Sequence, residues 1–213
     1  FELENRGDPL TYKGVVYNEM KGVYSSPDSL LARSTQQALF PDNTYGVDSG
    51  GDPLVIPTLS FEDFQDFHRK FYHPSNSRIF FYGDDDPTER LAFLDQHLDE
   101  FERIDVTHSQ VHYQSKNKKP ESLRIKYPVS SESEPKHYLT VNWLLNDEPL
   151  PAHDMLALGV LDSLLLGQSS SKLRKILTES QLGDSVTGGG LSDELLQSTF
   201  SVGLKGVKPA DVE

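Results

Sequence analysis

The hydrophobic pattern of this chain fails in one place, between about Asp105 and Ser122, and that break limits the possible folds more than any other feature. Residues 115–119 are all polar, and Pro120 follows them. A polar segment without periodicity is typical of a linker between regions that bury separate cores. With 213 residues, the chain is long enough for one large core or two modest ones. We therefore predict two domains, residues 1–104 and 123–213, joined by a linker at residues 105–122.

The beginning of the first predicted domain is rich in helical patterns. Apolar residues recur at helical spacing between Tyr12 and Phe40, and Ser26-Pro27-Asp28 resembles an N-cap followed by proline in a first turn. We expect two helices there, or one kinked helix. A loop rich in turn-forming residues follows from Pro41 to Pro57, and Ser60 begins another helix with Asp63 at the capping-box position.

The end of this domain predicts one strand and one more helix. The helix from Ser60 stops at His73-Pro74, and the aromatic and β-branched run from Arg78 to Tyr82 predicts a strand. Thr88 is the predicted cap of a further helix, whose apolar stripe extends to Phe101.

The second predicted domain alternates strand-like and helical patterns in the order strand, strand, helix, helix, strand. This order favours an α+β layer with the helices on one face of the sheet. We expect the glycines at 188–190 to form a turn between elements. The polar turn between the first two strands is expected from Ser130 to Pro135. The five elements are expected at Leu123–Tyr127, Tyr138–Leu145, Ala152–Leu166, Ser170–Ser180 and Thr199–Val207.

Composition excludes several kinds of function. Cysteine is absent, which excludes disulfides, thiolate metal sites and a cysteine nucleophile, so any metal would be held by His, Asp or Glu. The formal charge of −13 argues against a nucleic-acid surface, and no apolar stretch approaches the roughly 18 residues that a membrane span needs. We therefore expect neither a nucleic-acid partner nor a membrane span. The acidic balance itself is common among proteins that need only solubility.

Three histidine pairs come close to metal-binding spacing, and none is convincing. His108 and His112 are four apart, but they lie where helical periodicity fails and have no adjacent carboxylate. His97 begins like the inverted motif H-x-x-E-H, yet Phe101 stands in place of the second histidine. For His68 and His73, which are five apart, packing or capping is the better interpretation.

Other catalytic motifs are absent from the sequence, which leaves one carboxylate of interest. No G-x-S-x-G elbow occurs, and Gly188-Gly189-Gly190 lacks the Lys-Ser/Thr of a phosphate-binding loop. Ser49-Gly50-Gly51 is interpreted as a loop, although such a loop at a cleft edge could approach a peptide backbone. Glu19 lies on the first predicted helix, and spacing leaves open whether its carboxylate faces solvent or points into a site.

Beyond these patterns, nearly the whole chain resembles the organellar presequence proteases, which are pitrilysin-type zinc metallopeptidases, and most closely their plant and algal branch. The resemblance runs in a consistent order along the sequence. It rests on residues 12–24 (YKGVVYNEMKGVY), 43–53 (NTYGVDSGGDP), 72–76 (YHPSN), 82–87 (YGDDDP), 141–145 (VNWLL), 173–177 (LRKIL) and 190–196 (GLSDELL).

The resemblance implies a zinc site that this sequence supplies only in part. In that family an inverted H-x-x-E-H motif provides two histidine ligands and the glutamate general base, and a later glutamate completes the site. The matching glutamate is Glu19, which is therefore the expected Zn²⁺ ligand. No H-x-x-E-H occurs among these residues, so we expect it upstream of Phe1. This segment would then hold no catalytic residue, bind zinc poorly and be inactive alone.

The resemblance also implies an architecture and a role. The two predicted domains would be successive pitrilysin-like, mitochondrial-processing-peptidase-like α+β domains, both incomplete, with helices packed on antiparallel sheets. The first would end a catalytic domain and the second would begin a non-catalytic repeat. The complete protein would be a monomeric oligopeptidase of the mitochondrial matrix or the chloroplast stroma. It would degrade targeting presequences, transit peptides and other short unstructured peptides.

Two readings remain beside this one. The protein could be a non-catalytic relative that serves as a scaffold or assembly subunit, or it could bind peptides without hydrolysing them. Retention of Glu19 favours the peptidase. The acidic balance would suit cationic presequences as substrates.

Overall fold

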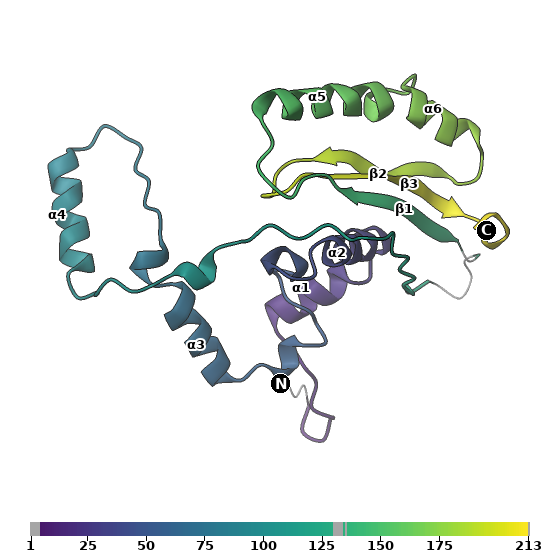
Figure 1. The fold of residues 1–213 in the computed structure, drawn as a ribbon. Coiled ribbons are helices and arrows are strands. Elements are labelled where there is room, and N and C mark those ends of the chain that lie inside the picture. Colours follow the sequence, from purple (N-terminus) through teal and green to yellow (C-terminus); the bar gives the residue numbers. More distant parts are fainter. Residues whose placement is uncertain (1–4, 130–133, 135, 213) are drawn as a thin grey trace. The chain divides into compact units, whose positions relative to one another are not determined.

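A computed structural model of the chain describes residues 5–129, 134 and 136–212 (Figure 1). The chain divides into two compact units. Unit 1 combines residues up to Pro53 with those from His112 onward, and unit 2 contains Leu54–Val111. None of the helices in the described part of the chain combines the length and apolarity needed to cross a membrane.

Unit 1 begins with two helices, as predicted from the Ser26-Pro27-Asp28 pattern. Helix α1 spans Val15–Val23 and helix α2 spans Pro27–Leu39. The Ser26 hydroxyl accepts a hydrogen bond from the Ser29 N–H at 3.4 Å, and Pro27 occupies the first turn. Proline suits that position because its missing N–H would have no partner within the helix.

The rest of unit 1 is an α+β layer, which confirms the predicted fold class (Figure 1). Strands β1 (His137–Leu144), β2 (Ser185–Ser192) and β3 (Thr199–Val207) form an antiparallel sheet in the order β1-β3-β2. Helices α5 (Ala152–Asp162) and α6 (Lys172–Glu179) cover one face of it, and the π-helical turn η5 (Ser163–Gly167) continues α5. The predicted turn from Ser130 to Pro135 lies largely outside the described residues.

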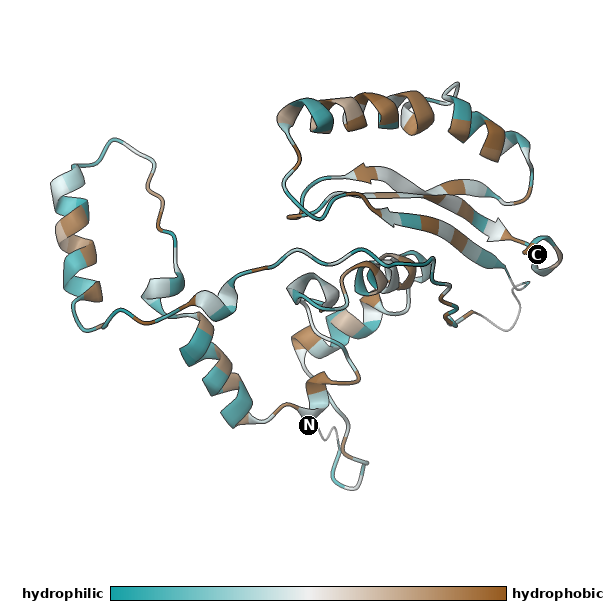
Figure 2. Cartoon of the chain, in the orientation of Figure 1, coloured by the Kyte–Doolittle hydropathy of each residue, from teal (hydrophilic) through white to brown (hydrophobic). Residues whose placement is uncertain are grey.

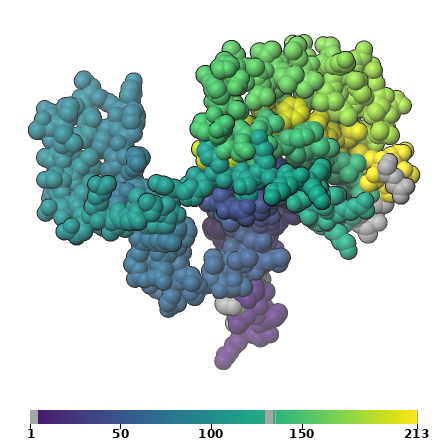
Figure 3. Space-filling view, viewed as in Figure 1, coloured from purple at the N-terminus to yellow at the C-terminus, as the bar shows by residue number. Residues whose placement is uncertain are grey.

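The core of unit 1 follows the central strand. Val202, Leu204 and Val207 of β3 are buried, as is Leu166 of the π-helical turn above the sheet. Apolar residues dominate α5 and alternate along β1 and β3 in Figure 2. In Figure 3 the atoms of α5 and α6 lie over those of the sheet. A central strand has the most apolar surface removed from solvent, and that burial stabilises the layer.

The glycines at 188–190 lie inside β2, so the predicted turn is wrong. They form a β-bulge, because the pairing of β2 with β3 shifts between Thr187 and Gly190. Their φ angles are positive, and a Cβ on Gly188 would lie 2.5 Å from the Cα of Val202. A bulge with positive φ and a close backbone neighbour requires glycine. The order of the elements along this part of the chain is therefore strand, helix, helix, strand, strand.

Residues 123–127 form no strand, although their composition predicts one. Leu123 and Ile125 are exposed, and the Tyr127 hydroxyl donates a hydrogen bond to the Lys136 carbonyl. A strand needs a neighbour to pair its backbone groups, and the described residues supply none for this segment.

Unit 2 contains two capped helices. Helix α3 spans Phe61–Phe71 and begins with the predicted capping box: the Ser60 hydroxyl accepts from the Asp63 N–H at 3.0 Å, and Asp63 accepts from the Ser60 N–H at 3.2 Å. Helix α4 spans Pro87–Leu98. Its cap is Asp86 and not Thr88, because the Asp86 carboxylate accepts from the N–H groups of Thr88 and Glu89. Short 3₁₀ turns occur at Thr44–Gly46 (η1), Ile56–Thr58 (η2), Pro74–Asn76 (η3), Thr107–Ser109 (η4) and Pro209–Asp211 (η6).

The strand predicted from Arg78 to Tyr82 is also wrong. These residues have an irregular backbone, and Phe80 and Tyr82 are 87% and 96% exposed. Residues 54–111 contain no strand, so the backbone of this segment has no ladder to join. Aromatic and β-branched composition therefore indicates a strand only when a partner is present.

Candidate functional site

Glu19 projects from the exposed side of α1. Its neighbour Met20 is buried, so the helix packs through Met20 and leaves the carboxylate of Glu19 open to solvent. Beside it, the Lys21 ammonium lies 5.3 Å from the centre of the Tyr17 ring, which in turn meets Tyr12 edge-on. The Glu19 side chain is therefore exposed on α1.

Within the described residues, no group of three His, Cys, Asp or Glu side chains could hold a metal ion. The histidines pack or cap instead. The His73 Nδ1 accepts a hydrogen bond from the Ser75 N–H at 3.2 Å, and the His68 ring stacks on Tyr72 with 4.9 Å between centroids. His108 meets Phe71 edge-on, and the Nδ1 of His97 lies 2.8 Å from the Phe93 carbonyl.

The glycine loop that follows Asp48 packs directly against α1. The Asp48 Oδ1 accepts from the Gly50 N–H at 3.0 Å, and the Asp48 carbonyl accepts from the Gly51 N–H at 3.0 Å. A Cβ on Gly50 would lie 2.4 Å from the Met20 sulfur. Glycine at position 50 therefore lets the loop backbone contact the residue next to Glu19.

One arginine joins this loop to both helices. The Arg33 guanidinium of α2 lies over the Tyr24 ring at 4.2 Å, and Tyr24 ends α1. The Arg33 Nε is 3.3 Å from the Asp48 Oδ2, and its Nη2 is 3.3 Å from the Asp52 Oδ2. The Tyr24 hydroxyl donates to the same Asp48 oxygen at 3.4 Å. We name Tyr24, Arg33, Asp48 and Asp52 the Arg33 clamp.

The electrostatics of the clamp favour a neutral tyrosine. Burial is the main cause that raises the pKa of Tyr24 to about 12, and the neighbouring Asp52 and Asp48 carboxylates raise it further, while Arg33 opposes them. The phenol therefore stays protonated and can donate its hydrogen bond throughout the physiological range. The clamp is not predictable from the sequence, because its members extend from Tyr24 to Asp52 and follow no period. The one available signal is the pair of aspartates on either side of Gly50-Gly51.

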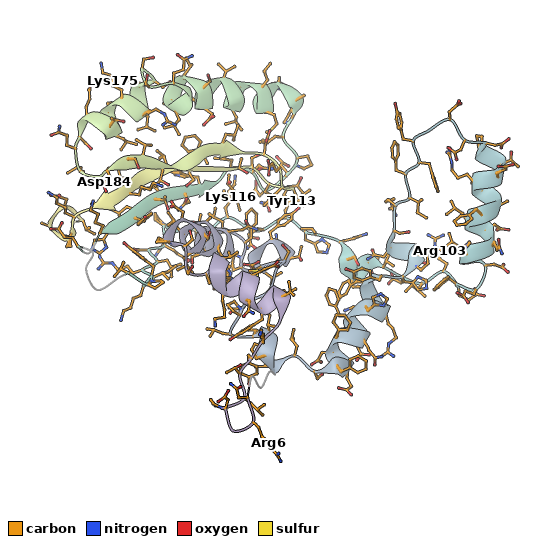
Figure 4. All side chains as sticks on the ribbon, turned by 180° about the vertical axis from the view of Figure 1, so that it is seen from behind. Arg6, Arg103, Tyr113, Lys116, Lys175 and Asp184 are labelled. Carbon is orange, nitrogen blue, oxygen red and sulfur yellow. The ribbon has the colours of Figure 1, made fainter. Side chains whose placement is uncertain are left out.

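A buried polar junction ties the N-terminal helices to the sheet. The Gln114 N–H donates to the Gln197 Oε1 at 2.5 Å, and the Gln197 Nε2 donates to the carbonyls of Gln114 and Asn146 at 3.0 and 2.6 Å. The Gln114 side chain exchanges hydrogen bonds with Asp42, just after α2. Tyr113 and Lys116, on either side of Gln114, lie beside the sheet in Figure 4, whereas Lys175 of α6 lies on its far side. Residue 114 is thus held by hydrogen bonds to both the segment just after α2 and the residues just before β3.

The described residues thus form an α+β layer and contain no group of side chains that could hold a metal ion by itself. Residues 58–213 match the family described as the peptidase M16 inactive domain, and the chain belongs to the peptidase M16 family. Glu19 lies before the matched region, which runs through the predicted linker. The division into domains at residues 105–122 stays a prediction.

Named relatives extend this likeness over the whole chain. It is 54% identical over 216 residues to presequence protease 1, chloroplastic/mitochondrial, of Arabidopsis thaliana, covering 100% of this chain and 20% of the relative. It is 39% identical to protein HypA of Clostridium perfringens, covering 96% of this chain and 21% of the relative. It is 36% identical to the mitochondrial presequence protease of Danio rerio, covering 100% of this chain and 21% of the relative. The chain thus spans about a fifth of the length of these relatives.

Proposed function

We propose that this chain is the part of a zinc-dependent oligopeptidase that supplies Glu19 as a zinc ligand. The observation that carries the proposal is the carboxylate of Glu19, exposed on α1 while the adjacent Met20 is buried. An outward carboxylate on a fixed helix is available to a metal ion held by further ligands. Membership of the peptidase M16 family supports that use.

The residues present fit one ligand and not a whole site. Zinc in hydrolases is bound by three protein ligands, and when bound it makes water a nucleophile near neutral pH. Glu19 can contribute one oxygen and offset part of the ion's charge. The 213 residues contain no H-x-x-E-H motif, so the histidine ligands and the general base would come from elsewhere in the polypeptide. By itself the segment is expected to be inactive.

The proposed substrates are cleaved presequences, transit peptides and other short unstructured peptides, in mitochondria or chloroplasts. The names of the relatives, presequence protease, support this substrate class and these compartments. The net charge of −13 suits presequences that are cationic. The proposed division assigns residues 1–104 to the end of a catalytic domain and residues 123–213 to a non-catalytic repeat.

The substitution Glu19→Gln tests the proposal in the polypeptide at the length of its relatives. Because an amide is neutral and a weaker ligand, zinc content per chain and hydrolysis of a presequence peptide should both fall. Glu89→Gln, an exposed helical glutamate of unit 2, is the matched control and should change neither. Unchanged zinc and activity in Glu19→Gln would refute the assignment. Zinc binding without hydrolysis in the unmodified protein would favour a peptide-binding module or a scaffold.

A further inference from the structure

The helix that carries Glu19 is short, and its own ends do little to hold it. Helix α1 has nine residues, no side-chain hydrogen bond at its N-cap, and one buried residue, Met20. A helix of this length is marginal by itself and depends on packing for its stability. Its position must therefore come from what contacts Met20 and Tyr24.

The loop between Asp48 and Asp52 contacts Met20, and Arg33 contacts Tyr24. The glycine loop that Asp48 shapes lies against Met20, while the Arg33 guanidinium covers the Tyr24 ring. The guanidinium is planar and carries donors in a fixed fork, so it can stack on a ring while it pairs with two carboxylates. Helix α2, the loop and the end of α1 are thereby joined through one side chain.

Because they are partly buried, the ion pairs of Arg33 should contribute more to stability than a pair on the open surface. The side chains of Arg33 and Asp48 are each 20% exposed, and that of Asp52 is 28% exposed. Without Arg33, the partly buried Asp48 carboxylate would lose the guanidinium that pairs with it, and removing one partner of such a pair is strongly unfavourable. The loop would be expected to leave Met20, and α1 would lose its support.

We propose that Arg33 is a positioning residue, which fixes Glu19 by joining α1, α2 and the loop Asp48–Asp52. This inference rests on the proposed function, since it assumes that Glu19 binds zinc. Arg33 is not itself proposed to bind metal or substrate. It acts through the two contacts that set where α1 lies.

The neighbouring unit offers a matched control arginine. Arg90 of α4 also lies over an aromatic ring, that of Phe81 at 4.7 Å, and also pairs with an aspartate, Asp85. Its side chain is 20% exposed, the same fraction as that of Arg33. Arg90→Met therefore removes the same kinds of contact as Arg33→Met, but within unit 2.

The test measures how fast zinc leaves the complete, zinc-loaded protein when a chromogenic chelator is added. Arg33→Met should release zinc about tenfold faster than the unmodified protein, the size of effect that supporting residues of metal sites usually have. Arg33→Lys keeps the charge but not the planar fork of donors, so its rate of zinc release should lie between those of Arg33→Met and the unmodified protein. Arg90→Met should release zinc at the unmodified rate.

The outcomes separate this inference from the proposed function. Equal acceleration in Arg33→Met and Arg90→Met would indicate general destabilisation and overturn the inference, as would unchanged release in Arg33→Met. If Arg33→Met does not fold, the comparison of Arg33→Lys with Arg90→Lys decides in the same way. If Glu19→Gln also leaves zinc release unchanged, the proposed function itself fails. If only Glu19→Gln accelerates release, the ligand assignment stands and the positioning role does not.

Discussion

Unit 1 and unit 2 form their helices by the same local rules but differ in what surrounds them. In unit 1, Phe40 is 1% exposed, and the central strand β3 is paired on both sides. In unit 2, the apolar side of α3 is open, with Phe64 69% exposed, and the segment from Arg78 to Tyr82 has no strand partner. Caps and spacing thus indicate where a helix lies, whereas a strand and a core require residues that are distant in the sequence.

The largest expected effect compares one residue type in both units. Phe40→Ala should lower the free energy of unfolding of the 213-residue chain by about 3–5 kcal/mol, because it empties a buried site beside Tyr45. Phe64→Ala should change it by no more than about 0.5 kcal/mol, because the ring is exposed. Urea unfolding measures both. Equal losses would contradict the contrast between the units.

The next effect concerns the buried polar junction. Gln197→Leu leaves the Gln114 N–H and the carbonyls of Gln114 and Asn146 without their partner, and should cost about 3 kcal/mol. The control Gln110→Leu changes an exposed side chain of unit 2 and should have little effect. Both are compared by urea unfolding of unit 1, followed by Trp143 fluorescence. A loss of stability in Gln197→Leu no larger than that in Gln110→Leu would mean that the junction contributes nothing.

The smallest effect concerns the cap of α4. Hydrogen bonds from the Thr88 and Glu89 N–H groups hold the pKa of Asp86 below its usual value. The cap's contribution is therefore complete above the unfolded pKa of about 3.9 and is lost as pH falls through the lower folded value. Asp86→Ala should speed amide hydrogen exchange in the first turn of α4 at neutral pH, and Thr88→Ala should not. Faster exchange in Thr88→Ala and unchanged exchange in Asp86→Ala would show that Thr88 is the cap.

The sequence predicted those parts of the fold that local chemistry decides. The Ser26 cap, the Ser60–Asp63 capping box and the α5 pattern were predicted correctly for that reason. Residues 78–82 and 123–127 were predicted as strands because composition does not reveal whether a partner exists. The β2 strand was missed because its glycines serve a bulge against Val202, a contact that only the fold creates.

The candidate site was predicted to a smaller extent. Glu19 came from resemblance, since its spacing on α1 is that of any exposed glutamate. The Arg33 clamp could not be predicted, because it unites α1, α2 and a loop through contacts without periodicity. Capping and packing explained His68 and His73 in advance, since a proline turn after His73 is a local signal.

The most direct measurement of the central claim is anomalous diffraction at the zinc edge from crystals of the complete, zinc-loaded protein. We predict a single strong peak at the end of the Glu19 side chain, with a carboxylate oxygen about 2.0–2.2 Å from the metal. A zinc peak whose ligands do not include Glu19 would contradict the account.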